Sequence, residues 1–379
     1  MAGGWADLSM DLLAMIANRI ESPKDFIFFT CVCTSWQIAT TPNHKFDIFF
    51  TKTPLLMLAD KHDDCREFYS LIKQKVTPLF LPEARQRYCF PSEGWLCTMD
   101  DTTGEMNLLH HLSRTQIQLP SRDNLMASNG LGDEVLWNLL EHAILSASPS
   151  VTSDYVLVVN YHANITRLAF WRPGDLNWTN IEMENSGAVM GINYYKGKFY
   201  YVTASGEFWV FQVPGPATPK PNAVEPHLLY WSEHDIFLQL SVQYYLVQLS
   251  DKLLFITRFA HHPELHRYKT YKFKVFEIDV VKGGELKEED EIKTLGNSAI
   301  FLGLNTGTCS IDSAKFAGVK PNYIYFTDDW KDEFDYLDGG GRDMGSYNFE
   351  DGKVESIYPG LSLSHISPPT WIIPSQIIC

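Results

Sequence analysis

The sequence lacks long apolar runs and an excess of basic residues, and each lack excludes a class of protein. None of its apolar stretches approaches the roughly 20 residues of a membrane-spanning helix, so we expect no such helix. Lys and Arg number 31 against 46 Asp and Glu, which gives a formal net charge of −15. Nucleic-acid binding through bulk electrostatics needs a basic footprint, so we expect no nucleic-acid partner. The acidic balance favours solubility, with a basic partner as the open alternative.

Cysteine is sparse and scattered. The chain has seven: Cys31, Cys33, Cys65, Cys89, Cys97, Cys309 and Cys379. Their number is odd and no C-x-x-C occurs, whereas a disulfide framework or a structural zinc site needs pairing or clustering. The N-terminus, Met-Ala-Gly-Gly-Trp, lacks the basic and apolar regions of a secretory signal. These patterns fit reduced thiols in a cytoplasmic and/or nuclear protein.

In contrast to cysteine, aromatic and turn-forming residues are abundant. Aromatics reach 13% of the 379 residues, beside 24 Gly and 20 Pro. This composition favours strands and turns over helices. A length of 379 residues allows one large domain or two to three ordinary ones.

Residues 5–45 are the exception, because their apolar residues recur with helical spacing. Leu8, Leu12, Ile16 and Ile20 lie four apart, and Leu13 widens the stripe. Ser9 can cap this first helix. Ser22-Pro23 ends it, since Pro23 disfavours a helical conformation at the residue before it.

A second helix is predicted after Pro23. It carries Phe26, Phe29, Cys33 and Trp36 at spacings of three, four and three, with Val32 beside them. A unit of about 40 residues cannot bury this much apolar surface alone. The surplus surface therefore docks on another protein or packs on the rest of the chain, and the pattern alone favours neither.

Beyond about residue 50 the sequence shows repeated strand–turn–strand signals. The clearest is the aromatic segment 197–213, in which Ser205-Gly206 forms the predicted tight turn. Similar units lie at 94–109, 155–171, 252–278 and 323–349.

These units predict a β-propeller. Phe276, Ile278 and Val280 alternate with Phe273 and Val275, so this strand is apolar on both faces and must be covered on both. Blades stacked around an axis provide that cover, whereas a β-sandwich, the competing architecture, favours shorter and more even strands. Five or six good units predict six blades, with seven possible. The final segment, 368–374, is expected to pair with the first blade and close the ring.

No strong catalytic or metal-binding constellation is found. An acidic cluster precedes three glycines and consists of Asp328, Asp329, Asp332, Glu333, Asp335 and Asp338. A calcium loop or a patch for basic substrates would use such residues, but the spacing does not match D-x-D-x-D-G. We therefore predict a solvated loop.

The histidines and the close cysteine pair are equally weak candidates. His261, His262 and His266 are expected in a loop between two strands, and Pro263 argues against the helix that would present a metal-binding pair. His110-His111 has less support still. Cys31 and Cys33 are interpreted as core positions on the second helix, because a buried cysteine behaves as a small hydrophobe.

Catalysis is not expected, although one enzymatic alternative stays open. No G-x-S-x-G occurs. Paired acids of a propeller glycosidase or lyase can be far apart in the chain, so sequence does not exclude them. A propeller scaffold is the other alternative.

Two parts of the chain resemble known families. The segments Trp5-Ala-Asp-Leu-Ser, Asp11-Leu-Leu-Ala-Met-Ile and above all Val32-Cys-Thr-Ser-Trp36 resemble an F-box. Asn322–Asp329, Asp343–Gly352 and Pro368–Ser375, together with Gly94-Trp-Leu and Ile117–Pro120, look like the plant domain of unknown function 295 of the KIB type. Family F-boxes commonly have Pro and Arg where Ser9 and Gln37 stand here.

The resemblance implies a mainly β protein with a small N-terminal α module. A three-helix F-box over residues 1–48 would precede a kelch-like propeller over 49–379, and the whole would be a substrate receptor of an SCF (Skp–cullin–F-box) ubiquitin ligase. The F-box would bind a Skp-type adaptor, and through it the cullin and RING subunits, by Leu8, Leu12, Leu13, Ile16, Ile20, Val32, Cys33 and Trp36. The propeller would bind a protein substrate, with no catalytic, cofactor-binding or metal-binding residue and no membrane partner. The loops expected to set its specificity are 121–153, 214–235, 260–270 and 328–342.

Overall fold

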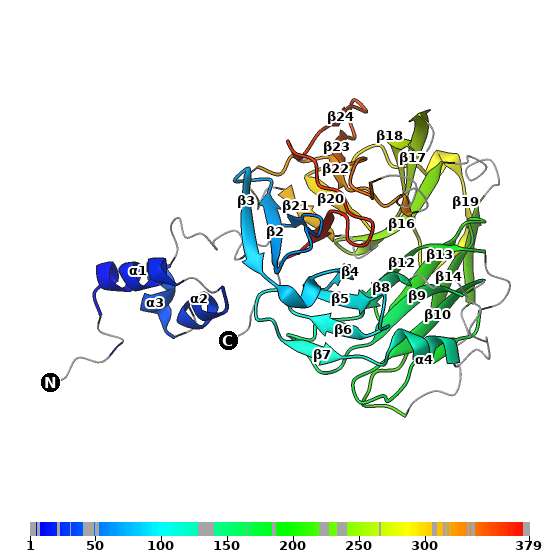
Figure 1. Ribbon diagram of the computed structural model, residues 1–379. Helices are drawn as coiled ribbons and strands as arrows, with labels where there is room; N and C mark the ends of the chain where they lie inside the picture. Colours follow the sequence, from blue (N-terminus) through cyan, green and yellow to red (C-terminus); the bar gives the residue numbers. More distant parts are fainter. Residues whose placement is uncertain are drawn as a thin grey trace.

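The computed structural model consists of three N-terminal helices followed by a ring of six sheets (Figure 1). It describes residues 5, 8–20, 23–30, 32–40, 49, 53–127, 140–163, 165–183, 187–219, 227–232, 241–264, 267–304, 309–313, 316, 318–331, 334 and 338–373. Among these residues no helix is both long and apolar enough to cross a membrane.

The N-terminal helices are α1 (Met10–Arg19), α2 (Pro23–Thr30) and α3 (Thr34–Ala39). The predicted cap is confirmed, because Ser9 Oγ accepts a hydrogen bond from the Leu12 N–H at the start of α1. The prediction of one continuous second helix is wrong. Cys33 is extended (φ −167°, ψ 172°) and separates α2 from α3, within a Val-Cys-Thr segment of low helix propensity. The apolar side chains still meet across this break, since the rings of Phe29 and Trp36 lie 4.4 Å apart.

The predicted propeller has six blades, as its strand pairing shows. Blade 1 contains β25 (Thr370–Ile372), β1 (Leu55–Met57), β2 (Cys65–Ser70) and β3 (Lys75–Phe80). Blade 2 contains β4 (Arg87–Ser92), β5 (Trp95–Asp100), β6 (Met106–Leu109) and β7 (Gln116–Gln118). Blade 3 contains β8 (Leu140–Leu145), β9 (Leu157–Ala163), β10 (Ile165–Trp171) and β11 (Thr179–Ile181).

The remaining blades are less regular. Blade 4 contains β12 (Val189–Tyr195), β13 (Lys198–Thr203), β14 (Phe208–Phe211), β15 (His227–Ser232) and β19 (Gly284–Leu286). Blade 5 contains β16 (Val242–Leu249), β17 (Lys252–Glu264) and β18 (Arg267–Ile278). Blade 6 contains β21 (Cys309–Asp312), β20 (Ser298–Leu302), β22 (Tyr323–Phe326), β23 (Gly345–Asn348) and β24 (Val354–Glu355). Short helices lie at α4 (Arg122–Ala127), η3 (Pro82–Ala84) and η5 (Glu288–Asp290).

The C-terminal strand closes the ring, as predicted. Leu55, Leu56 and Met57 of β1 pair antiparallel with Ile372, Trp371 and Thr370 of β25. The innermost strands contact one another in the order β25, β4, β8, β12, β16 and β21. Because the ring is closed, each of these six blades packs against a neighbouring blade on both sides.

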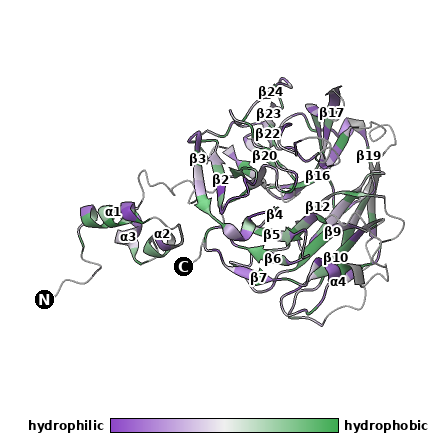
Figure 2. Ribbon diagram, viewed as in Figure 1, coloured by the Kyte–Doolittle hydropathy of each residue, from purple (hydrophilic) through white to green (hydrophobic). Residues whose placement is uncertain are grey.

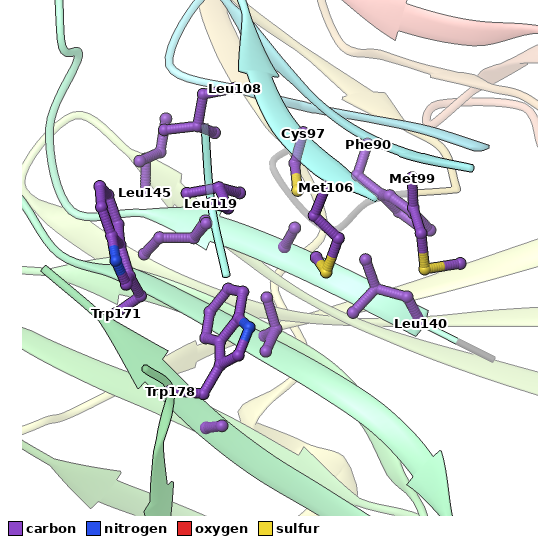
Figure 3. Packing of buried hydrophobic residues seen from close by; sticks show 14 of the residues in the cluster. Phe90, Cys97, Met99, Met106, Leu108, Leu119, Leu140, Leu145, Trp171 and Trp178 are labelled. Atoms are coloured by element: carbon purple, nitrogen blue, oxygen red, sulfur yellow. The ribbon is translucent and has the colours of Figure 1, made fainter. Parts of the chain in front are cut away.

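The hydrophobic core is divided among the interfaces between blades. Between blades 2 and 3, the side chains of Phe90, Met99, Leu140, Trp171 and Trp178 lie in one cluster (Figure 3). The two-faced strand is confirmed in β18: Phe276 and Ile278 pack towards blade 4, and Phe273 and Val275 towards blade 6.

The helical module lies beside blade 1, at the left of Figure 1. Its buried residues Leu13 and Phe26 belong to the same hydrophobic cluster as Phe49 and the blade residue Phe68. The rings of Phe49 and Phe68 meet edge to face at 5.2 Å. The domain boundary between residues 48 and 49 stays a prediction, and this contact agrees with it.

Candidate functional site

The helical module carries a concentration of exposed apolar side chains. Half of the large hydrophobic residues that are exposed in the described part of the chain lie before residue 39: Trp5, Met10, Leu12, Met15, Ile16, Phe28, Val32 and Ile38. Figure 2 shows hydrophobic residues along these helices. An exposed apolar patch of this kind marks an interaction surface.

Helix α1 is apolar on more than one face, and this explains the surplus. Leu13 and Ala17 turn inward and are buried. Leu12, Met15 and Ile16 point outward, with exposed fractions of 48%, 52% and 38%. Because a helix places residues three and four apart on one face, Leu12, Met15 and Ile16 form one continuous strip.

The predicted adaptor-binding residues divide into three groups. Leu12, Ile16 and Val32 are exposed, and Leu13 is fully buried. Half-buried positions are held by Leu8, Ile20, Cys33 and Trp36. Met15, Phe28 and Ile38 were not predicted, although the sequence places them beside the apolar stripe.

Trp36 contributes mainly to the interior of the module. Its ring packs against Phe29, and its Nε1–H donates to the backbone oxygen of Trp5 at 3.2 Å. It therefore fixes the segment before α1 against α3.

On the propeller, a buried polar network surrounds Arg258 of β17, a residue that the sequence did not predict as a site. The side chain is 0% exposed. Its Nη1 donates to Asp329 Oδ1 at 2.8 Å, and its Nη2 donates to Asp343 Oδ2 at 2.9 Å. Its Nε donates to Thr270 Oγ1 at 2.7 Å, and Nη1 also reaches the Thr327 backbone oxygen at 2.8 Å. The only signal in the sequence is a charged residue within the apolar run 253–260.

Aromatic rings and a tyrosine hydroxyl complete the surroundings of Arg258. Its guanidinium lies 4.6 Å from the ring centroid of Phe326 and 5.4 Å from that of Trp330. Tyr245 donates its O–H to Asp329 Oδ2 at 2.6 Å. Burial by itself lowers the pKa of Arg258, but Tyr245, Asp329 and Asp343 raise that pKa more, so the net shift is upward. The guanidinium therefore stays charged.

The predicted solvated acidic loop is wrong for its first two members. Asp328 is buried, and its Oδ2 accepts hydrogen bonds from the N–H groups of Gly341 (2.8 Å) and Arg342 (2.9 Å). Asp329 is held by Arg258. Asp338 is exposed, as expected. The other three acids, Asp332, Glu333 and Asp335, lie outside the described residues.

The Arg258 network supports one wall of a pocket of about 480 Å³ at the rim of blades 5 and 6. Two of the four predicted specificity loops, 260–270 and 328–342, meet there. The ring of Trp330 stacks on Tyr268 with centroids 4.0 Å apart and an angle of 11°. The charged side chains that line the pocket are Arg267, Lys269, Arg342, Asp328 and Asp343. Of the other two stretches, 121–153 contains α4 and β8, and 214–235 contains β15.

The histidines lie in different surroundings from those predicted. His261 and His262 belong to β17 rather than to a loop, and His262 packs against Tyr268 with centroids 4.1 Å apart. His266 lies outside the described residues. His110 and His111 are buried beside blade 2. Across the described ranges, no three His, Cys, Asp or Glu residues are placed to hold a metal ion.

A second, smaller cavity of about 280 Å³, here called the axial cavity, lies where the innermost strands end. Residues from all six blades line it: Ser92, Glu93, Ile144, Leu145, Asn193, Tyr194, Gln248, Ser250, Ser310 and Ile373. Glu93 is the only carboxylate among these lining residues.

Comparison with known proteins supports the two-part organisation. The family described as "KIB1-4 beta-propeller" matches residues 68–348. A "Probable F-box protein" of Arabidopsis thaliana is 25% identical over 374 residues, covering 89% of this chain and 93% of that protein. An "F-box/kelch-repeat protein" of the same species is 22% identical over 361 residues, covering 87% and 85%. The match to the solved structure of YCF48 from Cyanidioschyzon merolae covers 49% of this chain and 56% of that chain at 12% identity, with a TM-score of 0.29.

The family match spans parts of all six blades, and the relatives' names agree with the F-box resemblance of the N-terminal helices. The chain therefore belongs to the KIB1-4 beta-propeller family and joins an F-box-like helical module to that propeller.

Proposed function

We propose that this chain is the substrate-receptor subunit of an SCF-type ubiquitin ligase. Its helical module docks a Skp-type adaptor, and its propeller binds a protein substrate. Ubiquitin is transferred by other subunits, so this chain contributes proximity between the substrate and the transferring machinery. The proposal places the protein in the cytoplasm, the nucleus or both.

The observation that carries the proposal is the exposed apolar strip of α1 with its neighbours. Leu12, Ile16 and Val32 are the predicted contacts that are exposed. We add Met15 and Phe28, which are exposed at 52% and 58% on the same module. A few apolar anchors usually dominate such an interface. The buried Leu13 and the half-buried Leu8, Ile20 and Trp36 pack in the core of the module and hold the anchors in position. The half-buried Cys33 stays a proposed contact.

The rim pocket is the proposed first contact for the substrate. It combines stacked aromatic rings with charged side chains around a preformed concave surface. Aromatic residues and arginine are enriched among the residues that dominate protein interfaces. The buried Arg258 network fixes the segment that carries Trp330 and Arg342.

Two alternatives were open from the sequence. A glycosidase or lyase needs two convergent acids in one pocket. At the axial cavity the lining residues contribute one carboxylate, and at the rim pocket Asp328 and Asp343 are both engaged by internal hydrogen bonds. A scaffold without ligase function differs from a receptor only in adaptor binding.

Adaptor binding therefore tests the proposal. A purified Skp-type adaptor is expected to bind the full chain, and Leu12→Asp is expected to weaken this binding at least tenfold, because the charge would be buried against an apolar partner. The matched control is Val281→Asp, at a propeller residue that is 89% exposed. Both variants should unfold at the wild-type temperature. Wild-type protein that is folded but does not bind the adaptor would favour the scaffold.

A further inference from the structure

Two amide oxygens at the axial cavity are available as hydrogen-bond acceptors. Asn193 Nδ2 donates to the Leu246 backbone oxygen at 2.7 Å, and Gln248 Nε2 donates to the Ser250 backbone oxygen at 2.9 Å. A carbonyl oxygen can only accept, so these contacts fix which end of each amide is the NH₂ group. The two amide oxygens are left for another partner.

A hydroxyl at the same place is used in the same way. Ser310 Oγ donates to the Gln248 backbone oxygen at 2.7 Å. Ser92 Oγ accepts the Leu145 N–H at 2.9 Å. Three of the lining donors, on Asn193, Gln248 and Ser310, are thus used by backbone oxygens. The amide oxygens of Asn193 and Gln248 can accept hydrogen bonds from a ligand.

Glu93 supplies the only formal charge among the lining residues. It lies in the Glu93-Gly94 turn between β4 and β5, and its backbone oxygen accepts the Ser148 hydroxyl at 2.8 Å, which holds the turn in place. No residue in the described part of the chain forms a hydrogen bond or an ion pair with its carboxylate. The Glu93 side chain stays exposed at the cavity. The protein atoms around it nevertheless raise the pKa of its carboxyl group above the ordinary value, because they desolvate its charged form.

Asp154 adds a second negative charge close to a lining residue of the axial cavity. Burial raises the pKa of Tyr194, another lining residue, and the negative charge of Asp154 raises it further. Lys196, in the turn after β12, already has a partner: its Nζ donates to the Asp251 backbone oxygen at 3.1 Å.

We propose that this axial cavity binds one cationic side chain, lysine or arginine, from a basic peptide segment of a partner protein. Its volume of about 280 Å³ falls below the range of drug-sized ligand pockets and suits a single side chain. The ammonium or guanidinium group would meet the Glu93 carboxylate and the amide oxygens of Asn193 and Gln248. Charge-assisted hydrogen bonds are stronger than neutral ones, so Glu93 would contribute most of the selectivity.

Peptide binding tests the proposal without any ligase component. Isothermal titration of the full chain at low ionic strength would compare acetylated, amidated pentapeptides of alanine with Arg, Lys, Gln or Glu at the centre. The Arg or Lys peptide is expected to bind at least tenfold more tightly than the Gln peptide, and the Glu peptide should not bind. Comparison of Arg with Lys shows which cation is preferred.

Glu93→Gln is expected to reduce binding of the basic peptide about tenfold, and Glu93→Lys to abolish it, because the new cation occupies the cavity. The control is Glu289→Gln, at an exposed carboxylate in η5. Thermal unfolding checks that each variant is folded. Equal binding of the Arg, Lys and Gln peptides, or unchanged binding by folded Glu93→Gln, would overturn the proposal. Adaptor binding is unaffected in either case, so this result is separate from the receptor proposal.

Discussion

Arg258 Nη2 lies 2.9 Å from Asp343 Oδ2, although the two residues are 85 positions apart in the chain. Both side chains are almost completely buried. The contact connects the middle strand of blade 5 to the segment that precedes β23 of blade 6. Asp343 also accepts the Thr270 N–H and the Trp330 Nε1–H, so one carboxylate orders both sides of the rim pocket.

Removal of Arg258 is expected to destabilise the propeller strongly. Arg258→Met leaves Asp329 and Asp343 buried without a cation, and breaking a buried ion pair in this way costs about 3–5 kcal/mol. The free energy of unfolding from urea titration measures the effect. Lys252→Met, at the start of the same strand, breaks only the exposed pair with Glu277 and should change little. Equal effects of the two substitutions would contradict the structural role of the network.

A glycine at the centre of the ring gives a second prediction. A Cβ atom at Gly191 of β12 would lie 2.8 Å from the Tyr244 backbone oxygen of β16. Because the obstacle is backbone, Gly191→Ala should lower the free energy of unfolding by about 1–3 kcal/mol, the usual cost of overpacking. At Gly187 the nearest atom, Ser205 Oγ, is 3.8 Å away, so Gly187→Ala is a matched control. A wild-type stability for Gly191→Ala would show that the two inner strands can separate.

The architecture of the propeller could be predicted because strand patterns are local. Alternation over 273–278 identified a strand covered on both faces, and Ser205-Gly206 indicated the turn between β13 and β14. The break at Cys33 could not be found in this way. Helical spacing continues across it because Phe29 and Trp36 still face one another.

The polar site could not be predicted, because its partners are distant in sequence. Asp328 and Asp329 belong to a charge run, which usually indicates a solvated loop. Their burial depends on Arg258, 71 positions from Asp329, and on the backbone of Gly341 and Arg342. No local pattern contains this information.

The buried histidines predict that stability falls with acid. Desolvation lowers the pKa of His110 to about 4 and, with the charge of His110, that of His111 to about 3. In the unfolded chain both take up protons near pH 6.5. The unfolded state therefore binds more protons below pH 6.5, and the native state loses about 1.4 kcal/mol per pH unit for each histidine between about pH 6.5 and 4.

Urea unfolding at a series of pH values measures this slope. His111→Phe keeps a ring against Phe68, whose centroid lies 6.0 Å away, and removes one titrating group, so its stability should fall less steeply over this range. A variant slope as steep as that of the wild type would show that His111 does not contribute.

The last prediction separates an anchor from a support in the helical module. Leu12 is 48% exposed, whereas Trp36 packs on Phe29 and donates to the Trp5 backbone. Trp36→Ala should therefore loosen α1–α3 as well as weaken adaptor binding, because a large aromatic-to-alanine change leaves a cavity. Hydrogen exchange of the amides in residues 10–39 is expected to accelerate in Trp36→Ala and to stay at the wild-type rate in Leu12→Asp. Unchanged exchange in Trp36→Ala, together with lost binding, would instead make Trp36 a direct contact.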